Sequence, residues 1–282
     1  MAKLSVGEIK DNNRLDAFLA GSGAYSSRSL AAKFCDAEKI KVNGVVANKK
    51  LKIAEGDIIE YEPAVEDTEL VGEDIDLDIR YEDDEILVIS KPAGLVCHPA
   101  YGHPNGTLVN ALIHHCGKEH LCDIQTDHKR IGIVHRLDAD TSGLIICAKT
   151  DEAGLALSAS LKAHEVVRCY KTLVYGNVKQ DTGKIDVPLL RTVNKRPKMI
   201  ASNDPKAKNA ITEFKVLERI NSDFGEFSLV ECNIITGRTH QIRAHMDYIK
   251  HSVVGDWLYA SSKPKDFDAE KDLGLTRQFL HS

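Results

Sequence analysis

The sequence lacks any apolar run long enough to cross a membrane. Its 282 residues are 43% hydrophobic, but no continuous apolar segment approaches the roughly 18 residues that a membrane-spanning helix needs. The first residues, MAKLSVGEIKDNNRLD, contain no apolar core behind a charged start, so they do not have the pattern of a secretory signal. We therefore expect a globular, monomeric protein of the cytoplasm that has no membrane partner.

The sequence also lacks the spacings that indicate disulfides, metals or nucleotides. Its seven cysteines are widely scattered with no CxxC pair, and several lie in apolar runs such as LIICAKT and LVECNII. This odd, scattered set is typical of buried reduced thiols and not of a disulfide framework. Neither GxGxxG nor GxxxxGK[ST] occurs, and no internal repeat is visible, which argues against the common phosphate-binding loops and against repeat folds.

The net charge of −5 would by itself argue against a nucleic-acid partner. The negative charge is concentrated, however, because residues 62–85 contain 12 acidic side chains and one basic one. The rest of the chain carries a small excess of positive charge, and a local basic groove is enough for RNA binding. An RNA partner is therefore compatible with this composition.

Residues 13–61 have the pattern of a small self-contained module. RLDAFLAG has apolar residues at helical spacing, and Ser26 or Ser27 could cap a second helix over SRSLAAKFCDAEK. The Asn-Gly pair in KIKVNGVVAN predicts a tight hairpin, and LKIAEGDIIEYE ends in a further strand. The acidic residues 62–74 that follow are predicted to form a mobile linker.

Residues 75–282 are predicted to form one larger domain. We expect strands at EILVIS, IGIVHR, LIICAK, CYKTLVYG, AITEFKVL and FSLVECNII, and helices at TLVNALIHHC, EAGLALSASLKAHEV and HQIRAHMDYIK. Neighbouring strands are often joined too tightly for parallel crossovers. The sequence therefore predicts an α+β fold with a mixed, largely antiparallel central sheet flanked by helices, preceded by a small N-terminal α/β module.

Polar residues are concentrated in IGIVHRLDADTSGLIICAKT, between two apolar runs. Asp138 and Asp140 lie in this loop with His135, Arg136 and Thr141. Strand ends that lead into polar loops commonly present reactive groups on a rigid scaffold. The alternative is a structural turn in which one of the aspartates accepts hydrogen bonds from nearby backbone amides.

Three other segments could complete a site with this loop. In TGRTHQIRAHMDY, Thr239 could cap a helix whose Arg243 would keep a nearby carboxylate ionised. In VRCYKTLVYG, Tyr170 or Tyr175 could line a cleft and stack on a base. Residues 184–208 form a basic loop suited to phosphate contacts. The alternatives are a solvated surface helix, packing tyrosines and a solvated loop.

Five ordered motifs together resemble the RluA-type family of RNA pseudouridine synthases. HRLDADTSG fits the HRLDxxTSG motif of that family, and ISKPAGLVCHP with GTLVNALIHH is similar to its KPxGLxVHP segment. YKTLVYG and GRTHQIRAH resemble its tyrosine motif and its third motif. Residues 13–61 resemble the RNA-binding module that the family shares with a ribosomal small-subunit protein, S-four. The resemblance covers essentially the whole chain.

The resemblance implies a role for each matching residue. Asp138 would act at the ribose C1′ of the target uridine, either as a nucleophile or by assisting glycal formation. Arg243 would pair with Asp138, and Tyr170 would stack on the base and help to remove its C5 proton. Arg136 would replace the flipped base in the RNA stack. The basic residues expected to contact RNA phosphates are Arg191, Lys195, Arg196 and Lys198, with Lys41, Lys49 and Lys50 of the first module.

The resemblance also implies the substrate, and it implies a reaction without a cofactor or a metal. It is strongest to members that modify large-subunit ribosomal RNA, with transfer RNA as the alternative. The reaction moves a glycosidic bond from N1 to C5 of uracil, so it needs neither a cofactor nor a metal. Relatives continue past a segment like TRQFLHS with another strand, which implies that a C-terminal strand of the sheet is missing here.

Three other functions are compatible with parts of the sequence. The first is an RNA-binding protein without catalysis, which retention of Asp138, Tyr170 and Arg243 argues against. The second is a glycosidase using Asp138 and Asp140, which lie too close in sequence to face each other across a substrate. The third is a zinc hydrolase, whose ligand spacings do not match the usual zinc pairs; its ligands would come from His114, His115, Cys116, His120, Cys122 and His128.

Overall fold

The computed structural model describes residues 1–7, 13–25, 27–63, 70–100, 103–125, 128–192 and 198–282. The chain divides into two compact units, Met1–Glu69 and Leu70–Ser282. The buried apolar residues of each unit cluster separately, so no hydrophobic core among the described residues continues from one unit into the other.

The N-terminal unit, Met1–Glu69, is a four-stranded antiparallel sheet with two helices. Its elements are β1 (Ala2–Ser5), α1 (Leu15–Gly21), α2 (Arg28–Asp36), β2 (Ile40–Val42), β3 (Val45–Val46) and β4 (Ile58–Tyr61), and its strand order is β1-β4-β2-β3. The Asn43-Gly44 turn has positive φ at both residues, which confirms the predicted tight hairpin. Ser27 caps α2, since its side chain accepts a hydrogen bond from the Leu30 N–H at 3.2 Å; Ser26 lies outside the described residues.

This unit begins earlier in the chain than the sequence indicated. We predicted a module over residues 13–61, but β1 pairs with β4 along its whole length. Residues 2–5 are too few to show strand periodicity by themselves, and their pairing partner lies more than fifty residues away. The sheet therefore includes the first strand of the chain.

The C-terminal unit, Leu70–Ser282, contains the larger sheets. Its strands are β5 (Ile79–Glu82), β6 (Ile86–Lys91), β7 (Gly143–Ala148), β8 (Cys169–Tyr175), β9 (Thr182–Asp186), β10 (Leu189–Arg191), β11 (Met199–Ala201), β12 (Ile211–Ser222), β13 (Gly225–Ile234) and β14 (Leu280–His281). Its α-helices are α3 (Leu108–Cys116), α4 (Asp151–Lys162), α5 (Gln241–Tyr248) and α6 (Ala269–Leu273), and two 3₁₀ turns are Lys118–His120 and His128–Arg130. The strand orders are β5-β6-β7, β14-β8-β13-β12-β9 and β10-β11, all antiparallel. The predicted α+β class with largely antiparallel sheets is confirmed.

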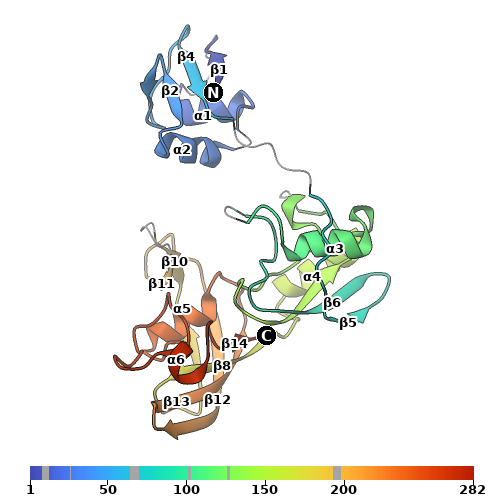
Figure 1. Ribbon diagram of the computed structural model, residues 1–282, viewed down its shortest axis with the longest axis vertical. Coiled ribbons are helices and arrows are strands. Elements are labelled where there is room, and N and C mark those ends of the chain that lie inside the picture. Colours follow the sequence, from blue (N-terminus) through green and yellow to red (C-terminus); the bar gives the residue numbers. More distant parts are fainter. Residues whose placement is uncertain (8–12, 26, 64–69, 101–102, 126–127, 193–197) are drawn as a thin grey trace. The chain divides into compact units, whose positions relative to one another are not determined.

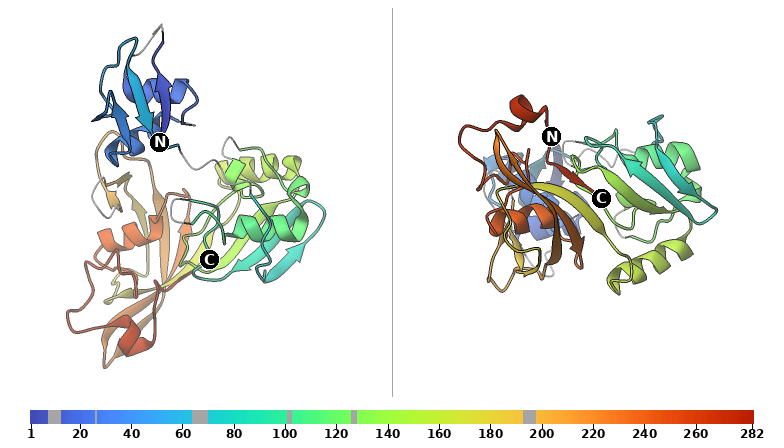
Figure 2. Two further views of the ribbon diagram at one scale, coloured as in Figure 1. Left: turned by 45° about the horizontal axis from the view of Figure 1, so that its top comes forward. Right: turned by 90° about the horizontal axis from the view of Figure 1, so that it is seen from below.

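The last residues of the chain join the two larger sheets. The Ser282 N–H donates to the Ser142 carbonyl at 2.9 Å, and the Leu144 N–H donates to the Ser282 carbonyl at 3.1 Å. Since β14 also pairs with β8, the end of the chain lies between β7 and β8. Figures 1 and 2 show the resulting division into two lobes, with α3, α4, β5 and β6 in one and α5, α6, β12 and β13 in the other.

Two predicted segments of this unit were wrong. The strand expected at IGIVHR is irregular, because Gly132 has a φ of 74° that breaks an extended chain, while Ile131 and Ile133 are nevertheless buried in the core. The basic loop expected over residues 184–208 instead contains the end of β9 and the β10–β11 pair. In the first case Ile133 forms an isolated antiparallel bridge with Cys147 of β7, but the segment does not form a regular strand.

The acidic segment divides between the two units. We predicted a linker over residues 62–74, of which 64–69 lie outside the described residues. Leu70 packs against the core of the C-terminal unit, and the Glu73 N–H donates to the Asn110 carbonyl at 3.0 Å. Residues 70–74 therefore belong to that unit. No helix in the described ranges is long and apolar enough to cross a membrane.

Gly143, the glycine of HRLDADTSG, lies where the two larger sheets meet. Its φ is +122°, a conformation that L side chains rarely adopt. A Cβ at this position would overlap the backbone O and N of Ser282. Backbone cannot move aside as a flexible side chain can, so the contact between β7 and the end of the chain requires glycine.

We therefore predict that Gly143→Ala destabilises the C-terminal unit by about 2–4 kcal/mol, from strain at positive φ together with overpacking. Gly225→Ala is the matched control, since Gly225 has a similar φ of +115° but no neighbour within 4 Å. Urea denaturation should show a clearly larger loss of stability for Gly143→Ala than for Gly225→Ala. Equal losses would mean that the contact with Ser282 contributes nothing.

Candidate catalytic cleft

A cleft of about 410 Å³ lies in the C-terminal unit beside the loop that carries Asp138. Its walls come from residues 133–138 with Thr141, from Arg168 and Tyr170, and from Ile234 with residues 237–243 up to the first turn of α5. Among the lining residues, Asp138 is the only carboxylate. Six cationic side chains accompany it: Arg130, Arg136, Lys162, Arg168, Arg238 and Arg243. The cleft therefore combines one acidic group with a strongly basic wall.

The loop around Asp138 is fastened to the strands on either side. Lys91, at the end of β6, is 1% exposed and donates to the carbonyls of Pro92, Leu95 and Ala139 at 2.8–2.9 Å. His135 accepts a hydrogen bond from the Ile146 N–H of β7 at 2.9 Å, and burial lowers its pKa to about 4, so it is neutral. Lys91 and His135 therefore hold the loop in place without using the carboxylate of Asp138, which lines the cleft.

Arg243 joins Asp138 to a second, buried carboxylate. Its Nη1 donates to Asp138 Oδ2 at 3.0 Å, while Nε and Nη2 form a bidentate pair with Asp256 at 2.5 and 3.0 Å. The side chain of Asp256 is completely buried, whereas that of Asp138 is 18% exposed. Burial alone would lower the pKa of Arg243, but the two carboxylates outweigh it and raise the pKa. The guanidinium is therefore a fixed positive charge beside Asp138.

Tyr259 and His240 complete the surroundings of this ion pair. The Arg243 guanidinium lies over the Tyr259 ring at 5.1 Å, and the Tyr259 hydroxyl accepts from the Met199 N–H at 2.7 Å. That hydroxyl is 3.1 Å from His240 Nδ1, and His240 Nε2 is 3.9 Å from Asp138 Oδ2. Burial and the nearby guanidinium lower the pKa of His240 despite Asp138, so the ring is neutral at pH 7.

The helix that carries Arg243 starts differently from our prediction. We expected Thr239 as its N-cap, but the N-cap is His240, which has a left-handed φ of 51° and makes no side-chain cap. Gln241 instead fastens this end: it accepts from the Arg238 N–H at 3.1 Å and donates to the Ile211 carbonyl at 2.9 Å. The tight left-handed turn brings His240 back toward Asp138.

Tyr170 lines the cleft from β8, whereas Tyr175 does not. Tyr170 is 6% exposed, and burial raises its pKa despite a hydrogen bond with Ser282, so the phenol is protonated at neutral pH. Tyr175 packs against Phe227 and Phe267 in a separate aromatic cluster. Of the two tyrosines in this motif, only Tyr170 is placed to meet a ligand.

Arg136 extends the cleft wall from the exposed side of the loop. Its Nη1 lies 3.0 Å from His98 Nε2, and His98 Nδ1 lies 3.2 Å from the Pro99 carbonyl. A guanidinium can only donate, so Nε2 is the acceptor and the ring proton stands on Nδ1. His98 is 6% exposed, and its neutral ring therefore tethers a mobile cation at a defined place.

The residues predicted to contact phosphate are more widely separated than Asp138, Tyr170 and Arg243. Arg191 is exposed on β10, and Lys198 Nζ lies 5.4 Å from the centre of the Tyr259 ring, while Lys195 and Arg196 lie outside the described residues. In the N-terminal unit, Lys50 is exposed, Lys41 is partly buried on β2, and Lys49 pairs with Asp36 at 2.6 Å. Lys198 thus lies near the ring of Tyr259, over which the Arg243 guanidinium of the cleft also lies.

The sequence alone did not reveal Asp256, Tyr259, His98 and Lys91. Asp256 and Tyr259 lie within the largely apolar segment VVGDWLYA, in which nothing marks a partner for Arg243. Their side chains reach the site because Gly255 turns the chain with a φ of 77°. His98 and Lys91 lay in a motif that we recognised, but without a structure their partners could not be named.

Family models match both units of the chain. The model described as RNA pseudouridylate synthase matches residues 85–248, and the S4 domain model matches residues 13–59. The first of these covers more than half of the chain and includes Asp138, Tyr170 and Arg243. Asp256 and Tyr259 lie beyond its end.

Whole-chain relatives and solved structures agree with these matches. Uncharacterized RNA pseudouridine synthase YlyB of Bacillus subtilis is 41% identical over 270 residues, which is 95% of this chain and 86% of that protein. Ribosomal large subunit pseudouridine synthase D of Yersinia pestis is 38% identical over 286 residues, covering 99% and 84%. Human RNA Pseudouridylate Synthase Domain Containing 1 has the same fold, with a TM-score of 0.55 at 23% identity over 73% of this chain and 76% of that one. The chain belongs to the RluA-type family of RNA pseudouridine synthases, isomerases that here carry an N-terminal S4 RNA-binding domain.

Proposed function

We propose that this enzyme converts uridine to pseudouridine in large-subunit ribosomal RNA, with Asp138 as the catalytic carboxylate. The observation that carries the proposal is the isolation of Asp138. It is the one carboxylate among the described residues that line a cleft with six arginines and lysines, and it is hydrogen-bonded to Arg243 at 3.0 Å. Asp140 does not line the cleft, which argues against a glycosidase acid–base pair.

The isomerisation balances with the residues of the cleft alone. The N1–C1′ bond of uridine breaks, the uracil turns, and a C5–C1′ bond forms, after which the C5 proton leaves and N1 gains a proton. Asp138 acts at C1′, either by bonding to it or by assisting glycal formation. No electron is gained or lost overall, so the mechanism requires no redox cofactor.

Arg243 and Tyr170 have distinct roles in this mechanism. Arg243 places a positive charge beside Asp138 and fixes the direction of one carboxylate oxygen, because the other side of its guanidinium is held by Asp256. Tyr170 provides a ring face for the base and a hydroxyl near C5. Burial raises the pKa of Tyr170, so the hydroxyl that would help to remove the C5 proton carries its own proton before RNA binds.

Arg136 is proposed to occupy the place of the flipped base. Flipping costs a few kcal/mol of unstacking, which an inserted planar cation can partly offset. Arg136 is exposed, lines the mouth of the cleft, and is tethered by His98 at 3.0 Å. The tether limits the positions that the guanidinium samples before RNA binds.

The choice of RNA rests on relatives. Several proteins 37–42% identical to this chain are named ribosomal large subunit pseudouridine synthase D. Transfer RNA is the alternative substrate, and we propose that a cytoplasmic monomer acts on either. The N-terminal unit, with Lys41, Lys49 and Lys50, would supply further phosphate contacts.

Asp138→Asn tests the function directly. This change preserves shape but removes the charge, so we expect nearly normal RNA binding and a loss of at least about 10³-fold in turnover. Tritium release from C5-labelled uridine in transcripts of large-subunit ribosomal RNA and of transfer RNA measures turnover and identifies the substrate. Asp140→Asn is the matched control and should remain active. Substantial turnover by Asp138→Asn would sink the mechanism.

Asp256→Asn tests the support of Arg243. The amide of asparagine carries no charge and would turn its NH₂ group toward the Arg243 guanidinium. The buried guanidinium would then have only Asp138 as a charged partner, at a cost of about 3–5 kcal/mol of stability. We expect kcat to fall about 10–100-fold, as when the outer partner of a site group is lost, with KM for RNA little changed. An unaltered kcat in the folded variant would show that Asp138 alone positions Arg243.

Neutralising Arg191 and Lys198 tests the phosphate contacts. Each lost contact should reduce the slope of log affinity against log salt by about 0.7–0.9, because fewer counterions are released. The double variant Arg191→Gln/Lys198→Gln should therefore lower the slope by roughly 1–2. Lys271→Gln, on α6, is the control and should leave it unchanged. If the double variant keeps the slope of the parent enzyme, these residues do not touch RNA.

A further inference from the structure

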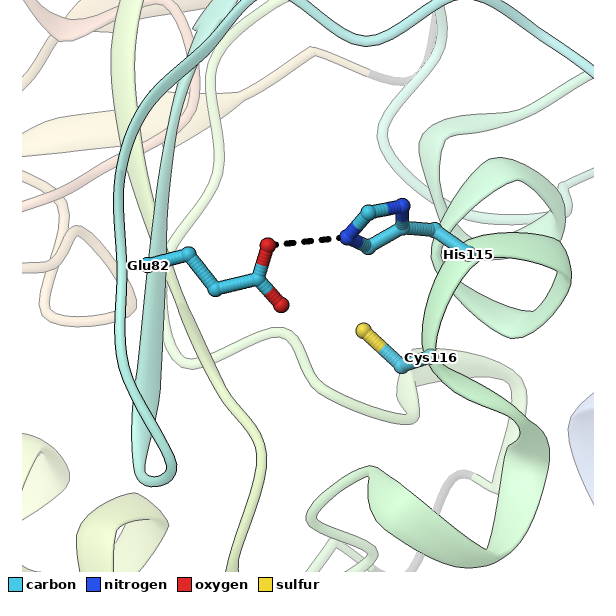
Figure 3. A group of neighbouring side chains, drawn as sticks. All are labelled: Glu82, His115 and Cys116. Carbon is cyan, nitrogen blue, oxygen red and sulfur yellow. Dashed lines mark hydrogen bonds and ion pairs between the residues drawn. The ribbon is translucent and has the colours of Figure 1, made fainter.

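Three side chains of different chemistry face one another in the other lobe of the C-terminal unit. Glu82 is the last residue of β5, and His115 and Cys116 are the last two residues of α3 (Figure 3). Glu82 Oε2 and His115 Nε2 are 2.9 Å apart, and the carboxylate, imidazole and thiol ligand atoms all lie within 4.8 Å of one another. None of the three lines the catalytic cleft.

We propose that Glu82, His115 and Cys116 form a binding site for a zinc-class divalent metal ion that joins β5 to the end of α3. A thiolate, an imidazole and a carboxylate are the donors that zinc binds in proteins, and three such ligands leave one tetrahedral position for water. Softer metals favour the sulfur and harder ones the oxygen, so this mixed set favours Zn²⁺ over Mg²⁺ or Ca²⁺.

The geometry requires only small movements of side chains. Metal–ligand bonds of about 2.0–2.3 Å place tetrahedral donors roughly 3.3–3.8 Å apart. The hydrogen bond between His115 and Glu82 would open by less than about 1 Å to admit the ion, and the longest separation in the cluster would close by a similar amount. All three side chains are partly exposed, so the ion can enter from solvent.

The surroundings attract cations. The three residues lie in an open cleft of about 770 Å³ whose acidic lining residues outnumber its two lysines. The acidic residues are Glu82, Asp84, Glu119, Asp123, Asp151 and Glu152. A cleft lined by one sign of charge raises the local concentration of the opposite ion. This cleft is therefore opposite in character to the basic catalytic cleft.

Lys149 orients the carboxylate without blocking the site. Its Nζ is 3.0 Å from Glu82 Oε1 and donates to the Asp83 carbonyl at 2.7 Å, which leaves Glu82 Oε2 turned toward His115. Partial burial would raise the pKa of Glu82, but the hydrogen bonds from His115 and Lys149 outweigh it and lower the pKa. The carboxylate of Glu82 is thus charged and held in place. Residues that hydrogen-bond to a metal ligand, as Lys149 does here, commonly orient that ligand.

Binding should release a proton from Cys116. Burial and the charge of Glu82 raise the pKa of the Cys116 thiol, so at neutral pH the sulfur carries its proton. Coordination replaces that S–H bond by a metal–sulfur bond, and the proton passes to solvent without any redox change.

The test is a cobalt titration of the full-length, untagged and reduced enzyme, followed by displacement with zinc. Thiolate coordination gives Co²⁺ a charge-transfer absorption that imidazole and carboxylate ligands do not give. We expect one equivalent of Co²⁺ with this band, which Zn²⁺ abolishes. Cys116→Ser should eliminate the band, and Glu82→Gln or His115→Asn should weaken binding at least tenfold.

Two residues outside the proposed site, His114 and Cys169, provide matched controls. His114→Asn removes the adjacent histidine and Cys169→Ser removes the exposed cysteine of β8, and both variants should bind Co²⁺ as the parent does. Zn²⁺ should also raise the Tm of the parent enzyme but not that of Cys116→Ser. Absence of the band at 100-fold excess of Co²⁺, or its persistence in Cys116→Ser, would overturn the proposal.

Discussion

The catalytic cleft depends on one buried guanidinium held between two carboxylates. Arg243 contacts Asp256, which is completely buried, and Asp138, which reaches the cleft. A buried ion pair gains little stability over apolar packing, but removal of one partner leaves an uncompensated charge at a high cost. Asp256 therefore serves mainly to make Arg243 rigid. A rigid Arg243 in turn fixes the direction of one oxygen of Asp138.

The residues of the cleft come from segments that are distant in sequence, and the sheets bring these segments together. Asp138 precedes β7, Tyr170 is on β8, and Arg243 follows β13. The end of the chain lies between β7 and β8, and Gly143 permits that approach only because it has no Cβ. The glycine of the motif thus permits the contact between the sheets, whereas Asp138, five residues before it, lines the cleft. Asp138 and Gly143 are close in sequence because both lie where the two larger sheets meet.

Local patterns predicted much of the fold and part of the site. The hairpin at Asn43-Gly44, the helices α1–α5 and most strands follow from turn chemistry and periodicity. The strand expected at IGIVHR was wrong because burial imitated strand alternation, and β1 was missed because its pairing is long-range. The family motifs predicted Asp138, Tyr170 and Arg243 as site residues. Asp256 could not be predicted, since a buried aspartate after an apolar run has no sequence signal without its partner.

The distribution of charge within the C-terminal unit explains how an acidic protein can act on RNA. The net charge is −5, yet the described residues that line the cleft beside Asp138 include a single carboxylate and six arginines and lysines. Six acidic residues line instead the separate cleft beside the end of α3, Glu82 among them. Because the Debye length is about 8 Å at physiological ionic strength, an RNA strand responds to the charges nearest to it and little to the total. The segregation of charge therefore lets one cleft attract phosphate while the other attracts cations.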